Sequence, residues 1–117
     1  MPNPKKRDNR RKFPRFEIPI QLRPTEVFGK EGRVQNISTG GVRIFGTKNV
    51  DVGTILKIDF SLPSGKWITA EILVVWAKKR PSESILKYDL GCRFTDVPPD
   101  SQTILIEYLS KQSSPIE

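Results

Sequence analysis

The chain of 117 residues contains no histidine and a single cysteine, Cys92. Histidine is the commonest general base and metal ligand near neutral pH, so its absence argues against a hydrolase or a metalloenzyme. A lone cysteine excludes an internal disulfide and fits a reducing compartment. Because Cys92 falls among alternating apolar residues, we expect a buried structural thiol. Carboxylates such as Asp59 and Glu71 belong to different expected strands, where solvated sheet faces explain them, and we expect no enzyme.

Long hydrophobic runs are also missing. No stretch of about eighteen apolar residues occurs, so the sequence predicts no transmembrane helix. The basic start, residues 1–7, leads into no apolar segment and therefore differs from a secretory signal. With 36% hydrophobic and 28% charged residues, the composition is that of one soluble globular domain, which we expect to be cytoplasmic.

Acidic charge is scarce at the N-terminus. Residues 1–15 hold seven basic residues against Asp8 alone, a net charge of +6, and the other 102 residues sum to +1 of the total +7. Residues 1–10 have nothing to bury after Met1, which predicts a flexible basic arm that meets an anionic partner first. Phe13 and Pro14 supply the first apolar surface and join this arm to the body.

The body shows repeated alternation of apolar and polar residues, which is typical of half-buried strands. Pro19 indicates an edge or a bulge in the first strand, and Gly91 a bulge or a close neighbour in the last. In the longest strand we expect Trp76 to share the inner face with Val74. The expected strands cover residues 16–22, 32–37, 42–46, 56–62, 67–78 and 86–94.

The pattern changes after Pro98. Asp100 is a natural N-cap, and apolar residues then recur at helical spacing, with Ile106 off the apolar stripe. Six short strands and a terminal helix predict an all-β fold: a small, closed or nearly closed six-stranded antiparallel β-barrel with a C-terminal α-helix. The expected domain covers residues 11–111, followed by a frayed tail, 112–117. The helical stripe consists of Ile104, Leu105, Tyr108 and Leu109.

Two polar patterns stand out against this framework. Asn36 and Ser38 precede Gly40 and Gly41 at a corner between two expected strands. Glycine there allows a positive φ and the close approach of another group. If Asn36 and Ser38 lie on extended backbone, their spacing of two residues points both to one face, where they could bond the edge of a flat polar ligand.

The second pattern is Arg11-x-x-x-Arg15 at the root of the arm. Guanidinium groups are always charged, form bidentate hydrogen bonds to phosphate and to the O6/N7 edge of guanine, and stack on bases. In so basic a segment the pattern also fits a solvated tail.

Together and in this order, Arg11-x-x-x-Arg15 and Asn36-x-Ser38-x-x-Gly41 resemble the motifs of the PilZ domain. Residues 74–76 (VVW) and 91–94 (GCRF) also look like later strands of that family. The resemblance covers residues 10–110. It implies a six-stranded barrel that binds cyclic di-GMP, a bacterial second messenger.

The resemblance also implies roles for individual residues. Arg11 and Arg15 would clamp phosphates and guanine edges, while Asn36 and Ser38 would hydrogen-bond a guanine base and Gly41 would keep the approach open. Asn36 stands where the family commonly has aspartate. Gly40 and Gly91 are further candidate ligand-binding positions.

Arg10 precedes the first motif, and family members with a basic residue there tend to bind two stacked ligand molecules. We therefore expect two molecules of cyclic di-GMP per chain and no other cofactor or metal. Ligand binding would order the arm and signal to an effector protein that no stretch of the sequence identifies.

Two other functions stay open. A β-barrel with a basic arm also describes proteins that bind RNA or DNA. The nearly neutral body argues against nucleic acid, as does the lack of an exposed aromatic platform, because we expect its only candidates, Phe45 and Trp67, in the core. The other alternative is a PilZ-like adaptor that binds no ligand, against which both motifs are intact.

Overall fold

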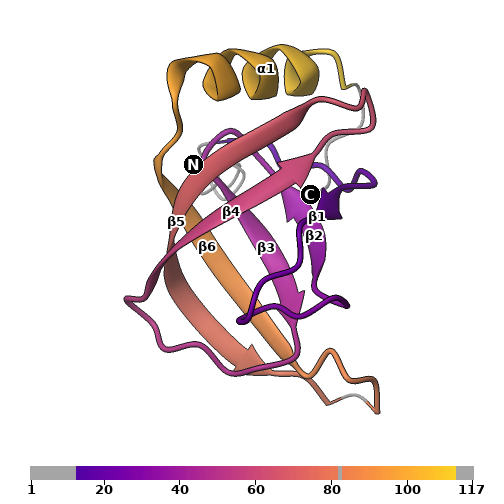
Figure 1. Ribbon diagram of the computed structural model, residues 1–117, viewed down its shortest axis with the longest axis vertical. Helices are drawn as coiled ribbons and strands as arrows, with labels where there is room; N and C mark the ends of the chain where they lie inside the picture. The colour runs from indigo at the N-terminus through magenta and orange to yellow at the C-terminus, as the bar shows by residue number, and fades with distance from the viewer. Residues whose placement is uncertain (1–12, 82, 113–117) are drawn as a thin grey trace, which may run out of the picture.

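The computed structural model describes residues 13–81 and 83–112. They form six antiparallel strands in a nearly closed barrel and one helix (Figure 1). The strands lie side by side in the order β1-β4-β5-β6-β3-β2, so the expected fold is confirmed. The expected arm, residues 1–10, lies outside the described part, as does the tail beyond Gln112. The elements are β1 (Gln21–Leu22), β2 (Arg33–Ile37), β3 (Gly41–Gly46), β4 (Ile55–Ser61), β5 (Trp67–Lys79), β6 (Tyr88–Asp96) and α1 (Pro99–Ser110).

The segment before β1 closes the barrel. Phe16 and Ile37 exchange two backbone hydrogen bonds, of 2.9 and 3.0 Å, and Gln21 and Leu22 then pair with β4. A continuous strand over 16–22 was expected, and that expectation is wrong in the middle. Pro19 has no N–H to donate, so the ladder stops after Phe16 and resumes only at β1.

The core lies inside the barrel and consists mainly of apolar side chains from the strands. In β5, burial alternates residue by residue up to Val74. Cys92 on β6 is only 5% exposed and packs within this core. Burial raises the pKa of its thiol to about 12, because the thiolate would lose its hydration. The expectation of a buried structural thiol is confirmed.

Helix α1 packs against β5 and lies across one end of the barrel (Figure 1). Leu105 and Leu109 are its buried residues, and Ile106 is exposed, as the apolar stripe predicts. The N-cap expectation was wrong: Pro98 occupies that position without a side-chain hydrogen bond, and Asp100 lies in the first turn. No helix among the described residues is long and apolar enough to cross a membrane.

Two aromatic residues expected in the core lie on the outside instead. Trp67, the first residue of β5, is 44% exposed, and the Arg23 guanidinium lies over its ring at 4.5 Å. Phe45 is only partly buried on β3, and the guanidinium of Arg80 stacks on it at 3.8 Å. Arginine side chains, and not the side chains of the core, therefore cover these two rings.

Candidate functional site

The corner between β2 and β3 is built by Ser38. Its Oγ accepts hydrogen bonds from the backbone N–H groups of Gly40 and Gly41, at 3.0 and 3.1 Å. Its own N–H donates to the Gly41 carbonyl at 2.9 Å. Ser38 is only 3% exposed, so its hydroxyl fixes the corner that a ligand would meet.

The two glycines are required for space and not for a left-handed backbone. The glycines with positive φ among the described residues are Gly29, Gly53 and Gly65, so the expectation of positive φ at this corner is wrong. A Cβ on Gly41 would collide with the backbone carbonyl oxygen of Cys92, and one on Gly40 with the ring of Phe13. The expected close approach to these glycines is therefore present. It is made by β6 and by the arm root, residues 13–15.

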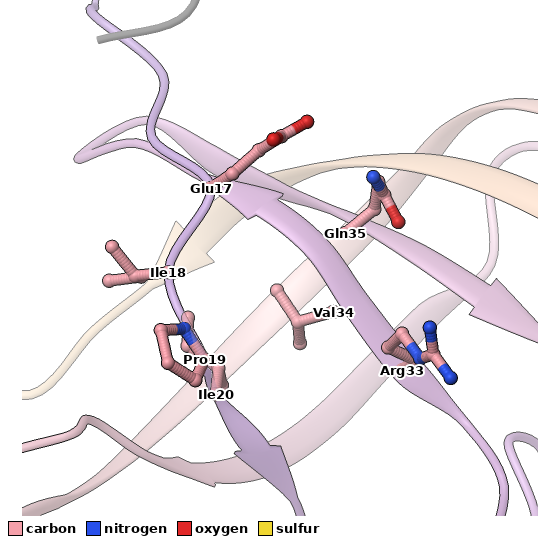
Figure 2. Close-up of a pocket in the computed structure, with 7 residues that line it drawn as sticks. All are labelled: Glu17, Ile18, Pro19, Ile20, Arg33, Val34 and Gln35. Atoms are coloured by element: carbon pink, nitrogen blue, oxygen red, sulfur yellow. The ribbon is translucent and has the colours of Figure 1, made fainter. Parts of the chain in front are cut away.

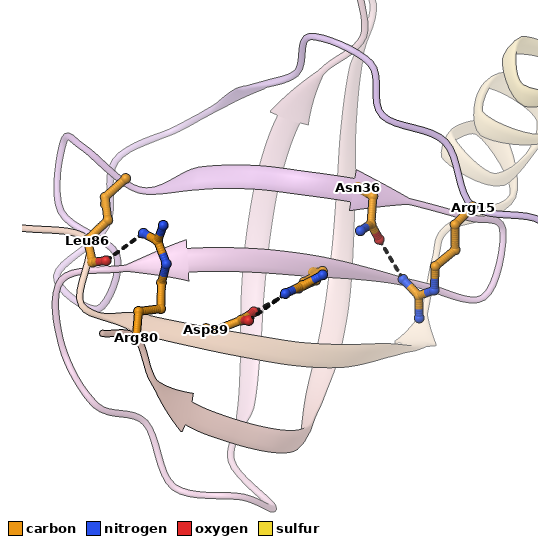
Figure 3. A network of polar contacts seen from close by, with 6 residues as sticks. Arg15, Asn36, Arg80, Leu86 and Asp89 are labelled. Carbon is orange, nitrogen blue, oxygen red and sulfur yellow. Dashed lines mark hydrogen bonds and ion pairs between the residues drawn. The ribbon is translucent and has the colours of Figure 1, made fainter. Parts of the chain in front are cut away.

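Asn36 connects the corner to the arm root. Its side chain is buried, 3% exposed, and its Oδ1 accepts a hydrogen bond of 2.8 Å from Nη1 of Arg15 (Figure 3). The register of β2 against β3 shifts between Val34 and Asn36, and such an irregularity re-aims the side chains that follow. Arg15 of the first motif and Asn36 of the second are therefore in direct contact.

A cavity of about 270 Å³ lies beside this contact. It gathers five of the candidate residues, whereas Asn36 reaches it through Arg15. Arg10 and Arg11 lie outside the described residues. The lining consists of Phe13, Arg15, Ser38, Gly40, Gly41, Val75, Trp76, Gly91, Cys92 and Arg93.

Trp76 forms a wall of this cavity because of a bulge in β5. The register against β6 shifts between Val74 and Trp76, so that Trp76 pairs with Gly91. A Cβ on Gly91 would collide with the indole ring, and the missing side chain lets the ring lie over β6. The expectation that Trp76 shares the inner face with Val74 was wrong, since one extra residue reverses the facing of those after it.

Sequence reasoning missed five residues that line the cavity: Phe13, Val75, Trp76, Cys92 and Arg93. The signal that could have found Trp76 is the glycine within β6, because a strand glycine marks a place where a neighbour approaches closely. The role of Arg93 follows from the pairing of Gly41 with Arg93, which no local pattern reveals.

The cavity is suited to an anion with a flat aromatic part. Arg15 and Arg93 supply positive charge, Trp76 supplies an aromatic plane, and no acidic side chain is among the lining residues. Across residues 13–81 and 83–112, no three acidic or cysteine side chains come together as a metal site requires.

A larger hollow, of about 440 Å³, lies elsewhere on the barrel, between the segment around Pro19 and β2 (Figure 2). It follows from the interrupted pairing at Pro19. Its lining carries one cation, Arg33, and one carboxylate, Glu17, with no aromatic ring. This hollow therefore lacks both the net charge and the stacking surface of the smaller cavity.

A model of the PilZ domain family matches residues 9–111. The chain belongs to the PilZ domain family. This PilZ domain places Ser38 and Gly41 of one motif, and Arg15 of the other, around the same cavity. The comparison with curated proteins finds no match to the sequence.

Two solved structures share the fold of this PilZ domain. The first is the Bacillus subtilis inhibitor of motility MotI/DgrA, with 21% identity and a TM-score of 0.67 over 90% of this chain and 54% of that one. The second is MrkH, described as a c-di-GMP-dependent transcription regulatory factor, with 20% identity and a TM-score of 0.59 over 89% of this chain and 53% of that one. The chain spans about half the length of each.

Proposed function

We propose that this PilZ domain is a receptor for cyclic di-GMP, which binds in the cavity between the arm root, the corner and Trp76. The observation that carries the proposal is the contact of Arg15 with Asn36 beside a cavity that also holds Ser38 and Gly41. Arg15 and Asn36 belong to different motifs and lie 21 positions apart in the chain, and the fold makes them neighbours.

The ligand's chemistry fits these groups. Cyclic di-GMP has two phosphates and two guanines, so it requires cations, stacking planes and groups that bond a base edge. Arg15 and Arg93 can pair with phosphate or with the guanine O6/N7 edge. The Trp76 ring offers a stacking surface, an interaction worth about 1–3 kcal/mol per base.

The size of the cavity indicates that it takes one part of the ligand. Its volume of about 270 Å³ lies just below the roughly 300–1,000 Å³ of most small-molecule sites. We propose that the rest of the ligand lies against the arm, where Arg11 and Arg10 would contact it, and that two stacked molecules bind per chain.

Signalling would follow from the arm. Closure of the arm, residues 1–10, over the ligand would change the surface that an effector protein meets, so this receptor, which we propose to be cytoplasmic, would need no reaction of its own. The description of MrkH as a c-di-GMP-dependent regulator supports this role for the shared fold.

Isothermal titration calorimetry with cyclic di-GMP tests the proposal. The wild type should bind, and Arg15→Ala and Asn36→Ala should each weaken binding by about 2 kcal/mol, roughly 30-fold. Arg33→Ala is the matched control, because Arg33 lines the other hollow, and it should bind like the wild type. A wild type that does not bind, or that binds no more tightly than Arg15→Ala, would refute the site.

A second titration separates this receptor from a nucleic-acid-binding protein. Cyclic di-GMP presents two phosphates, so its affinity should fall only modestly between 50 and 200 mM salt, whereas binding along a polyanion falls steeply. A single-stranded oligonucleotide is the comparison ligand. Tighter binding of the oligonucleotide, with a steep salt dependence, would replace the receptor assignment by the nucleic-acid alternative.

A further inference from the structure

Three residues form one row across the outer face of β3, β6 and β5. Arg43 pairs with Gly91, and Gly91 pairs with Trp76. Because directly paired residues share a face of the sheet, the side chains of Arg43 and Trp76 lie on either side of a position that has no side chain. The Arg43 guanidinium carbon is 5.8 Å from the centre of a Trp76 ring.

Asp89 holds Arg43 in this place. Arg43 donates to the carboxylate through Nε at 2.9 Å and through Nη2 at 2.7 Å. The Asp89 side chain is only 10% exposed, which reduces screening by water, and its hydrogen bond raises the pKa of Arg43. A two-point contact fixes the plane of the guanidinium as well as its position.

Other cations and rings extend the arrangement along the same face. The Arg43 guanidinium carbon also lies 5.6 Å from the centre of the Phe45 ring. Arg80, which follows the last residue of β5, covers the same ring. Arg80 in turn donates to the Leu86 carbonyl at 2.7 Å (Figure 3). Lys78 places its ammonium 5.1 Å from the Trp76 ring. Arg43 is therefore confined by a carboxylate and by two aromatic side chains.

We propose that Arg43, clamped by Asp89, is a positioning residue that holds the Trp76 indole as the stacking wall of the cavity. Arg43 is absent from the lining of the cavity, whereas Trp76 is part of it, so Arg43 acts through Trp76. Lysine cannot replace it, because a point charge makes neither the two-point contact nor a flat stack. The consequence for ligand binding rests on the proposed function; the positioning of Trp76 does not.

The test uses Trp67→Phe as the parent protein, in which Trp76 is the only tryptophan. Arg43→Lys keeps the charge, and Asp89→Asn removes the carboxylate. In each variant, acrylamide should quench Trp76 fluorescence more efficiently than in the ligand-free parent. Cyclic di-GMP should bind about threefold to tenfold more weakly, because the stacking surface is less ordered. The double variant should lose little beyond either single one, since both break the same contact.

Arg23→Lys is the matched control. Arg23 also lies over an aromatic side chain, that of Trp67, which the parent replaces by phenylalanine, and it contacts an aspartate, Asp59, at 3.4 Å. It has no place in the cavity lining. It should change neither the quenching of Trp76 nor the affinity. Thermal unfolding of every variant checks that it is folded at the temperature of measurement.

The readouts separate this inference from the proposed function. If the parent does not bind cyclic di-GMP, the receptor proposal fails, and the quenching comparison still decides whether Arg43 positions Trp76. If quenching is unchanged in both Arg43→Lys and Asp89→Asn, the positioning role is refuted, whatever the affinity. Increased quenching with unchanged affinity would support the positioning of Trp76 by Arg43 and refute its consequence for ligand binding.

Discussion

Arg15 donates a hydrogen bond of 2.8 Å to the buried amide oxygen of Asn36, and this contact attaches the root of the N-terminal arm to the barrel. In the proposed receptor, an arm that is anchored at its base has less chain to order when a ligand binds. The entropy cost of binding then falls mainly on the residues before the anchor.

The Arg15–Asn36 bond predicts a measurable coupling between the two residues. In a double-mutant cycle of Arg15→Ala, Asn36→Ala and the double variant, the coupling free energy of unfolding should be about 1 kcal/mol, as for a partly buried hydrogen bond. Urea unfolding at neutral pH measures it. Strictly additive effects would show that the two side chains are not bonded in solution.

Gly41 and Gly91 predict different consequences of the same substitution. Gly41→Ala should lower the free energy of unfolding by about 1–3 kcal/mol, because its methyl group meets backbone that cannot move without separating β3 from β6. Gly91→Ala meets a side chain, so we expect a smaller loss of stability and a displaced Trp76. Chemical denaturation and Trp76 fluorescence distinguish them, and equal destabilisation with unchanged fluorescence would contradict the expectation.

Cys92 predicts a pH dependence of stability. Its pKa is raised by burial to about 12 from an ordinary value of 9.0, so the folded chain keeps a proton that the unfolded chain loses first. The contribution is complete below pH 9 and is lost between pH 9 and 12, at no more than about 1.4 kcal/mol per pH unit. Denaturation of the wild type should therefore show a steeper decline over this range than that of Cys92→Ala. Parallel profiles would contradict a raised pKa.

Arg10 predicts the number of ligands bound. Two stacked dinucleotides bring four phosphates, and an additional guanidinium would offset part of their repulsion. Calorimetry should saturate at two molecules of cyclic di-GMP per wild-type chain and at one for Arg10→Ala. Saturation of the wild type at one ligand would refute the stoichiometry while leaving the site in place.

Local pattern predicted most of the fold. Alternation in the sequence located the strands, because a barrel wall needs one buried and one solvated face. It failed at Pro19, where the missing N–H interrupts pairing, and at Trp76, where a bulge turns the side chain outward. Alternation assumes a constant register, and a bulge depends on the partner strand.

The sequence alone determined the barrel with its helix and the order of the two motifs, since both follow from periodicity and short-range spacing. Tertiary structure decided that Arg15 reaches Asn36, that Trp76 lies over Gly91 and that Asp89 holds Arg43. These contacts join residues far apart in the chain. The pairing of Phe16 with Ile37 brings Arg15 to Asn36, and the pairing of β3, β6 and β5 brings the other residues within hydrogen-bonding or stacking distance.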